Sequence, residues 1–518
     1  MAITFELVTG KETVFSNSNP GPYEGKETNR LSGENNDRIL AIAYLNNEEN
    51  FGVDKYDIGH VVAAGQEGGK AALGWVCRDN LKAGGMSTFP FRRPVDVFAT
   101  GTFAHEIGHQ FGAHHTFSTN EGPCLEGFSS RGAYEIGSGN TILSYAGACG
   151  NNDLQGRRDD YYHAISVQQI LGYTTNEHGS ACPVLVETNN TPPTVTIREG
   201  GFVIPVNTPF TLVANANDED GDVLMYNWQQ FDNAVTQENM IGTVEEGEPM
   251  TREEYAKRLP PNTPEVHIDL LYQNYLQGFE NSFRGDGPLF RNFRPTTSNK
   301  RYFPQLDLVL SGDTSNKEVM PFTSRELNFV INVRDGRGGV THDLLSFSST
   351  EDAGPFVVTS KFSAPEYAGF SDLLIEWDMA KTNIAPVNCQ NVSIPCSTDG
   401  GKSFDITLLE RTANDGSETV RLPNIATSEA RIMVKAVDNI FFHVNDRDFN
   451  ITQSEVTAPE ASTRLIARKV TAREIKLLWT DNSEVEDGFI IEKQSANEVD
   501  FVEIGRTVGI GCCFLHGS

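Results

Sequence analysis

One eleven-residue stretch constrains this chain more than any other: residues 105–115 have the pattern H-E-x-x-H-x-x-G-x-x-H. His105 and His109 are four residues apart, so on a helix both imidazoles project from one face, one turn apart. Two neutral imidazoles at that spacing can bind one zinc ion. Gly112 lets the chain leave the helix through a backbone conformation that other residues avoid. That turn brings His115 back as the third ligand.

Glu106 is the predicted general base of this site. It follows the first ligand directly, so it can reach a metal-bound water without being a ligand itself. The fourth zinc position stays open for that water, as a catalytic zinc site requires. His114 is the alternative third ligand, although the spacing from Gly112 favours His115. The alternative for the whole stretch is a surface helix with incidental histidines.

The stretch resembles the zinc site of metzincin metallopeptidases, and most closely that of the reprolysin-like group, which includes the ADAM and snake-venom proteases. More narrowly, the chain is similar to the secreted multidomain reprolysin-like proteases of Bacteroidetes. Residues 72–77 resemble the sheet strand before the active-site helix, and residues 141–147 resemble the Met-turn under the zinc. The resemblance covers about residues 1–185. It implies an extended peptide substrate that pairs with an edge strand near 72–77.

Two residues depart from the reprolysin pattern. Leu143 stands where the family has the methionine of the Met-turn, and its similar volume can preserve the apolar floor of the site. Tyr145 stands where reprolysins have proline, whereas astacin- and serralysin-type metzincins have a tyrosine there. Tyr145 could act as a movable fifth ligand or donate a hydrogen bond to the oxyanion. A packed tyrosine bonded to backbone is the alternative.

The implied function is that of a secreted zinc endopeptidase acting on proteins or peptides. Zn²⁺, held by His105, His109 and His115, polarises the scissile carbonyl and acidifies its bound water. Glu106 removes the proton of that water and passes it to the leaving amine. The alternative from another class is an adhesion or binding protein, in which the peptidase fold is inert and the β modules grip a surface or polymer.

Charge and hydropathy exclude several partners. A net charge of −29 argues against nucleic acid or anionic membrane. No run of eighteen apolar residues is present, so no membrane span is expected. Residues 1–10 lack the basic and apolar regions of a signal peptide and predict a β-strand instead. The extracellular location therefore follows mainly from the resemblance, and the oligomeric state stays open.

Cysteines suggest disulfides within the peptidase. Four of the eight fall in this region: Cys77, Cys124, Cys149 and Cys182. Four cysteines allow three full pairings, among which the sequence cannot choose. We favour Cys124–Cys149, which would tie the segment after His115 to the Met-turn. Metal ligation by cysteine is the alternative. Further along the chain, Cys389 and Cys396 are expected to pair locally.

Periodicity predicts the elements around the site. Strands are expected at residues 56–62 and 71–77, and the Gly-rich residues 65–70 precede the second of them. The active-site helix should start near Pro94 or Asp96 and run to about Gly112. A closing helix is expected from Tyr161 to Leu171. Its His163 either supports the metal site from behind or is simply packed, and His60 is expected to be structural.

The predicted fold class is a multidomain chain: an α/β metzincin catalytic domain followed by all-β sandwich modules. The resemblance implies a strand and a long helix before residues 3–9, so the peptidase is interpreted as N-terminally abridged. The predicted domains are the peptidase (1–186), a cadherin- or PKD-like β-sandwich with an insertion (192–353), a β-sandwich module (354–455) and a partial fibronectin type III domain (458–518).

An acidic turn lies in the second of these domains. Asp218, Asp220 and Asp222 alternate around Gly221, and alternate carboxylates could bind Ca²⁺. The glycine is misplaced for an EF-hand, however, so an acidic turn without a metal is the alternative. A possible helix at 252–258 lies in the insertion of the same domain.

Overall fold

A computed structural model describes most of the chain, which divides into two compact units. The first unit holds residues 1–367, 371–423 and 427–451, and the second holds 368–370, 424–426 and 452–518. The residues described are 3–8, 21–26, 31, 35–47, 49–90, 99–119, 124, 127–234, 251–253, 287–312, 318–455, 461–471, 474–482, 488–494, 501–507 and 513–517. No described helix is both long enough and apolar enough to cross a bilayer.

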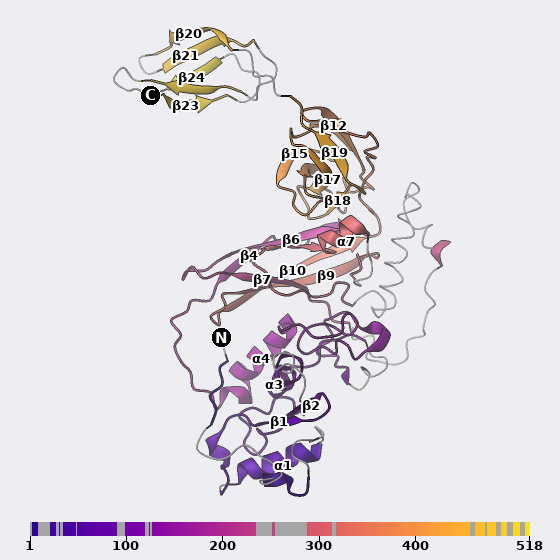
Figure 1. The fold of residues 1–518 in the computed structure, drawn as a ribbon, viewed down its shortest axis with the longest axis vertical. Coiled ribbons are helices and arrows are strands. Elements are labelled where there is room, and N and C mark those ends of the chain that lie inside the picture. Colours follow the sequence, from indigo (N-terminus) through magenta and orange to yellow (C-terminus); the bar gives the residue numbers. More distant parts are fainter. Residues whose placement is uncertain are drawn as a thin grey trace. The chain divides into compact units, whose positions relative to one another are not determined.

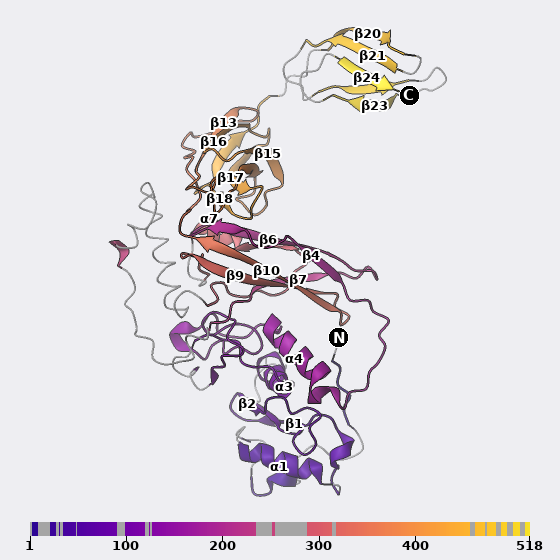
Figure 2. The same cartoon turned by 180° about the vertical axis from the view of Figure 1, so that it is seen from behind.

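The N-terminal region of the first unit, which the sequence predicts to be the peptidase, is a small mixed sheet with helices on both faces (Figure 1 and Figure 2). Strand β1 (His60–Ala64) is parallel to the central β3 (Gly85–Phe89), and β2 (Gly68–Ala71) is antiparallel to β3 at the edge. Helix α1 (Asn35–Asn46) covers one face. Helices α3 (Ala104–Gln110) and α4 (Ala164–Asn176) lie on the other. Short single turns complete this region: Gly21–Tyr23, Val53–Lys55, Ala99–Phe103, Gly150–Asn152 and His178–Ser180.

Two apolar clusters hold the helices to this sheet. On the α1 face, Met86 and Ala63 of the strands pack with the buried Tyr23. On the other face, Phe111 at the end of α3 packs with Tyr173 of α4. The Tyr173 hydroxyl donates to the backbone carbonyls of two turn residues, each at 2.7 Å, which satisfies its polar end. The active-site helix is thus fixed from below and from its C-terminal end.

The strand expected at 71–77 is wrong. The edge strand β2 (Gly68–Ala71) begins in the glycine-rich segment before it, and residues 72–77 contain turns and no strand. Gly74 has a φ of 67° and Cys77 a φ of 60°, which no strand allows. The backbone N–H of Gly74 donates instead to His109 O at 2.9 Å, so this segment caps α3. Among the residues described, this sheet ends at β2 on the side of α3.

Other elements also differ from expectation. Residues 3–8 form no strand, and β1 starts at His60 rather than near Tyr56. The active-site helix is short and follows one π-helical turn (Ala99–Phe103), while its expected start at 94–96 lies outside the described residues. The closing helix is shifted to Ala164–Asn176, with His163 as its N-cap. Of the helix expected at 252–258, only 252–253 are described, and these are helical.

The second region is a β-sandwich of two sheets, seen as two layers in Figure 1. One sheet has the order β4-β6-β8, and the other has the order β5-β10-β9-β7. Aromatic residues fill the space between them, because alternate strand residues point inward. Its elements are β4 (Thr194–Ile197), β5 (Val203–Pro205), β6 (Phe210–Asn217), β7 (Met225–Gln230), β8 (Lys300–Phe303), α7 (Leu306–Ser311), β9 (Arg325–Arg334) and β10 (Val340–Thr350).

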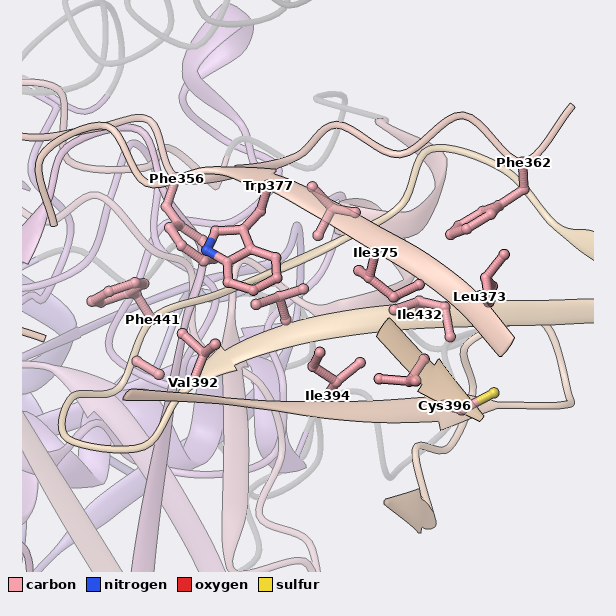
Figure 3. Close-up of a cluster of buried hydrophobic side chains, with 14 of the residues drawn as sticks. Phe356, Phe362, Leu373, Ile375, Trp377, Val392, Ile394, Cys396, Ile432 and Phe441 are labelled. Atoms are coloured by element: carbon pink, nitrogen blue, oxygen red, sulfur yellow. The ribbon is translucent and has the colours of Figure 1, made fainter. Parts of the chain in front are cut away.

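The third region is another two-layered β structure. One sheet has the order β11-β13-β16 and the other β12-β19-β17-β14-β15, with β18 also on β17. Inward-facing residues of β13, β14 and β17 meet across its core in Figure 3, among them Leu373, Ile375, Trp377, Val392, Ile394 and Ile432. Its strands are β11 (Val357–Val358), β12 (Tyr367–Ala368), β13 (Asp372–Asp378), β14 (Asn391–Ser397), β15 (Ile406–Ala413), β16 (Ser417–Arg421), β17 (Thr427–Ala436), β18 (Phe442–Val444) and β19 (Phe449–Thr452).

The local pairing expected for Cys389 and Cys396 is wrong, because both are buried free thiols. Cys396 belongs to the alternating inward face of β14 and packs as a small apolar residue. The second unit is also all-β, with sheets β20-β21-β24 and β22-β23. Its strands are β20 (Thr463–Lys469), β21 (Glu474–Thr480), β22 (Ile490–Lys493), β23 (Val502–Arg506) and β24 (Cys513–Gly517).

Candidate metal and catalytic site

Helix α3 and the turn after it bring the three predicted zinc ligands together. The Nε2 atoms of His105 and His109 are 3.2 Å apart, and that of His115 lies 3.2 Å from the first and 3.0 Å from the second. Zinc–nitrogen bonds of about 2.0–2.1 Å at tetrahedral angles place nitrogens about 3.4 Å apart. The triangle of nitrogens is therefore close to the size that one zinc ion needs.

The opposite ring nitrogens fix the tautomers. The Nδ1 atoms of His105, His109 and His115 lie 2.8, 2.7 and 2.6 Å from the backbone oxygens of Ile142, Ala113 and Gly127 respectively. A carbonyl oxygen only accepts, so each Nδ1 carries the hydrogen and each neutral ring keeps its Nε2 lone pair free. Three lone pairs that face one another at this distance repel unless a cation lies between them. The donor set therefore fits zinc.

Burial keeps these imidazoles in the neutral form that binds metal. It lowers the pKa of His109 to about 4 and that of His115 to about 3. The pKa of His105 is also held well below its ordinary value, first by burial and then by the Arg158 charge. At neutral pH all three rings can offer a lone pair without first losing a proton.

Gly112 shapes the turn after α3, and Leu143 forms the apolar floor of the site. Gly112 has a φ of 87°, the left-handed conformation that the turn to the third ligand needs. Leu143 of the Met-turn is fully buried, and its Cδ2 would lie 3.2 Å from a Cβ placed on Gly108 in α3. Leucine therefore supplies the apolar support under the helix where the family has methionine.

Glu106 points from α3 toward the edge strand. A Cβ on Gly69 of β2 would lie 2.5 Å from Glu106 Oε1, so only glycine leaves room for this carboxylate. Burial raises the pKa of Glu106 to about 8, against the opposing charges of Arg158 and Arg38. Zinc bound by the neighbouring histidines would oppose this shift, because a nearby cation favours the carboxylate form that a general base needs.

Tyr145 lies against the third ligand. Its ring centroid is 4.5 Å from that of His115 and 4.7 Å from that of Phe117. Gly127 leaves room for the ring, because a Cβ there would lie 2.9 Å from the Tyr145 hydroxyl. The ring packing that belongs to the alternative for this tyrosine is thus observed. Its ring also lines the cavity that holds His105 and Glu106, so a role in the reaction stays a prediction.

Arg158 is the residue of this site that the sequence analysis missed. Its Nε donates to Ser144 O at 2.7 Å and its Nη1 donates to Gly101 O. The guanidinium carbon lies 5.9 Å from the centre of the Tyr145 ring. Nothing in the local sequence Arg157-Arg158-Asp159-Asp160 distinguishes this arginine from a solvated charge run, because only the fold buries it beside Glu106.

The alternatives for the ligands can be compared with the geometry. His114 Nδ1 lies 3.0 Å from Ser129 Oγ, and its backbone N–H donates to Gln169, so its ring has another partner.

The favoured disulfide is confirmed, because Cys124 and Cys149 are bonded, and Cys77 pairs with Cys182. All four peptidase cysteines are therefore disulfide-bonded, and the alternative of cysteine ligation to a metal is excluded.

The acidic turn of the second region is built largely by its own hydrogen bonds. Asp218, Asp220 and Asp222 each offer an oxygen within 4.8 Å of the others. Asp218 Oδ1 already accepts from the backbone N–H groups of Asp220 and Asp222, and Asp222 pairs with Arg337 at 2.9 Å. Calcium binding at this turn stays a prediction. A calorimetric titration of the chain with Ca²⁺ tests it, and the absence of binding heat would contradict it.

Comparison with known proteins agrees with this site. Residues 1–174 match the family model described as metallo-peptidase family M12B, reprolysin-like. That part of the chain is a reprolysin-like metallopeptidase domain, a class that depends on zinc and acts on proteins or peptides. The family and the fold class expected from the zinc motif, a peptidase domain followed by β-rich regions, are both confirmed.

The other comparisons of the chain with known proteins show only weak similarity. No curated protein matches the chain significantly. Among solved structures, the chain is similar to the FN1–FN3 domains of chicken CNTN1, at 9% identity over 63% of this chain and 88% of that chain, with a TM-score of 0.14. It is also similar to the Ig1-2 module of the Drosophila receptor protein tyrosine phosphatase DLAR, at 8% identity over 51% of this chain and 100% of that chain, with a TM-score of 0.24. Scores this low establish no common arrangement of the domains.

Proposed function

We propose that this chain is a zinc-dependent endopeptidase in which Glu106 is the general base. The observation that carries the proposal is the triangle of Nε2 atoms of His105, His109 and His115, with sides of 3.0 to 3.2 Å. Glu106 lines the same cavity as His105. A metal site with three protein ligands and a carboxylate beside it is the arrangement of hydrolytic zinc enzymes.

Each residue then has a defined task. When bound, zinc supplies a Lewis acid that polarises the scissile carbonyl and makes water a nucleophile at neutral pH. Glu106 takes the proton of that water on its carboxylate and later delivers it to the leaving nitrogen. Burial raises the pKa of Glu106 and nearby cations lower it, and these opposing influences suit a group that must both accept and donate a proton. The backbone carbonyls behind the three histidines keep the rings in place.

An extended peptide fits the free edge of β2. Strand β2 pairs with β3 on one side, and among the described residues no strand pairs with its other side. The cavity beside it, of about 1020 Å³, reaches from Gly68 and Gly69 to Glu106. A substrate chain could add to this edge through backbone hydrogen bonds and continue past the zinc in both directions. This supports cleavage within chains rather than at their ends.

Metal removal tests the proposal. We expect that dialysis against a zinc chelator abolishes cleavage of a quenched casein substrate, and that one equivalent of Zn²⁺ per chain restores it. Mg²⁺ or Ca²⁺ at the same concentration is the control and should restore nothing. Cleavage that survives complete loss of zinc would contradict the mechanism. No cleavage by a fully zinc-loaded chain would favour the inert binding protein instead.

Tyr145 is proposed to assist the reaction through its hydroxyl. Tyr145→Phe keeps the ring that packs on His115 and Phe117 but removes the hydrogen-bond donor. We expect kcat to fall by about 10²-fold, with KM and zinc content unchanged, because an oxyanion donor acts only in the transition state. The measurement is steady-state cleavage of a fluorogenic peptide. An unchanged kcat would leave Tyr145 with a packing role alone.

An extracellular location is part of the proposal and is supported by chemistry. The two disulfides of the peptidase region persist in oxidising compartments and are rare in the cytosol. Fractionation of the producing cells checks this. Recovery of the chain mainly in the cytosol, with the four peptidase cysteines reactive toward a thiol label, would contradict it.

A further inference from the structure

A cavity of about 1020 Å³ lies beside the predicted zinc ligands. Its walls come from the edge strand, the start of α3, the Met-turn and the segment after it, represented by Gly69, Glu106, Tyr145 and Arg158. A substrate bound along β2 would have to place a side chain next to its scissile bond into this space. The polar groups on the wall therefore decide which side chain is accepted.

Arg158 is the anchored cation of that wall. Two backbone carbonyls, Ser144 O in the Met-turn and Gly101 O before α3, hold its Nε and Nη1. Among the described residues Nη2 donates no hydrogen bond, and this nitrogen is not sealed from solvent. A planar guanidinium fixed on one side presents its remaining N–H groups in a defined direction, which is the geometry that recognises a carboxylate.

The acidic groups near Arg158 do not satisfy it. Glu106 influences its charge but is engaged in the predicted proton transfer, and Glu67 is exposed at the mouth of the cavity. Asp159 and Asp160 pair instead with Arg294 of the second region. Its Nε lies 3.2 Å from Asp159 Oδ1 and 3.4 Å from Asp160 Oδ1. A carboxylate that enters from the substrate would thus find a pre-organised partner in Arg158.

We propose that Arg158 makes the peptidase select substrates with an aspartate or glutamate side chain next to the scissile bond. The inference rests on the proposed function, whose cavity it uses, and adds the chemical class of substrate. Arg158 is a specificity-determining residue in this scheme and takes no part in bond cleavage. Charge-assisted hydrogen bonds to carboxylates are strong enough for discrimination of about tenfold or more over a neutral amide.

The test uses fluorogenic peptides that are identical except for Glu, Gln or Lys at one of the two positions that flank the scissile bond. We expect kcat/KM for Glu to exceed that for Gln by about tenfold at one position, and that for Lys by more. In Arg158→Gln the Glu-to-Gln ratio should fall to about one. Arg158→Lys should keep part of the preference, because lysine retains the positive charge but lacks the paired N–H donors of the guanidinium. A role of Arg158 in folding alone would slow all three peptides equally.

Arg157 provides the matched control. It is the adjacent arginine and lines the same cavity, but it is exposed. Arg157→Gln should keep the preference for Glu. Collapse of the ratio in this variant, a preference for Lys in the parent, or equal cleavage of all three peptides would overturn the proposal.

A binding measurement separates selectivity from turnover. Peptide hydroxamates with Glu, Gln or Lys side chains are titrated by calorimetry into the zinc-loaded chain and into Arg158→Gln. The Glu compound should bind the parent about tenfold more tightly than the Gln compound, and this difference should vanish in the variant. Tight binding without discrimination overturns the Arg158 assignment and leaves the proposed function intact. Selective binding without any peptide cleavage supports Arg158 and contradicts catalysis, and a chain that takes up no zinc contradicts both.

Discussion

Glu106→Gln should abolish peptide-bond hydrolysis while leaving zinc bound. Glutamine has the same shape, so the space that Gly69 leaves for the side chain is still filled. It cannot take up a proton, however, and loss of a positioned general base lowers kcat by roughly 10²- to 10⁴-fold. The three imidazole ligands are untouched, so zinc content measured by atomic absorption should remain one per chain. A variant that keeps its activity would exclude Glu106 as the base.

Although Glu106→Gln should lose activity, it should raise the stability of the metal-free chain above neutral pH. Folding raises the pKa of Glu106 from 4.5 to about 8 through burial. The native state thus binds this proton more tightly than the unfolded chain does, so metal-free parent loses stability as the pH rises from about 4.5 through about 8. The glutamine variant has no such loss. Metal-free Glu106→Gln should therefore melt at a higher temperature than metal-free parent at pH 8, and the difference should vanish near pH 4.

Glu135→Gln should unfold the catalytic region more easily and weaken zinc binding, although Glu135 is not a ligand. Its carboxylate is almost completely buried. It accepts from the hydroxyls of Thr116 and Thr141, from two backbone N–H groups and from Asn292 Nδ2. An amide offers one acceptor where the carboxylate has two, and its own N–H groups would face these donors.

The expected cost follows from the donors left unpaired. Each buried donor without a partner costs about 1–3 kcal/mol, so the change should destabilise the region by about 2–4 kcal/mol. Thr116 follows His115, and Thr141 precedes the Ile142 carbonyl that holds His105, so zinc affinity should fall by about tenfold as well. Urea unfolding followed by zinc release measures both effects.

Glu177→Gln is the matched control for this prediction. Glu177 lies at the C-terminal end of α4 in the same region but is exposed, so the same chemical change should shift stability by less than about 0.5 kcal/mol. Equal effects of the two substitutions would show that the buried carboxylate does not organise the site. Because Asn292 belongs to the second region, the same network predicts that the peptidase is stabilised by its neighbour.

The ligand set was predictable because it depends on local geometry. Helical spacing places His105 and His109 on one face, and Gly112 permits the single turn that returns His115. The family resemblance rested on this stretch and on the segments 72–77 and 141–147, and it is confirmed. The Cys124–Cys149 pairing was favoured because it would tie the segment after His115 to the Met-turn, and it is confirmed too. The roles of Glu106 and Tyr145 and the domain boundaries stay predictions.

The edge strand was misplaced because short apolar runs look alike in sequence. Residues 72–77 are apolar since they pack under the end of α3, and a strand would have the same composition. The true edge, Gly68–Ala71, has Gly69 where only glycine leaves room for Glu106, and glycine does not favour a strand in sequence. Only the contact between two segments that are distant in the chain distinguishes these cases.

The sequence by itself predicted the metal ligands: two imidazoles at helical spacing and a third beyond the turn at Gly112, whose relative positions depend on local backbone geometry. The tertiary structure alone decided what surrounds these ligands. Arg158 faces the cavity, and Glu135 ties the Met-turn to the segment after His115, through contacts that join residues far apart in the chain. Such contacts leave no periodic signal, because the pairing of remote segments is set by the packing of the whole unit and not by the neighbours of either residue.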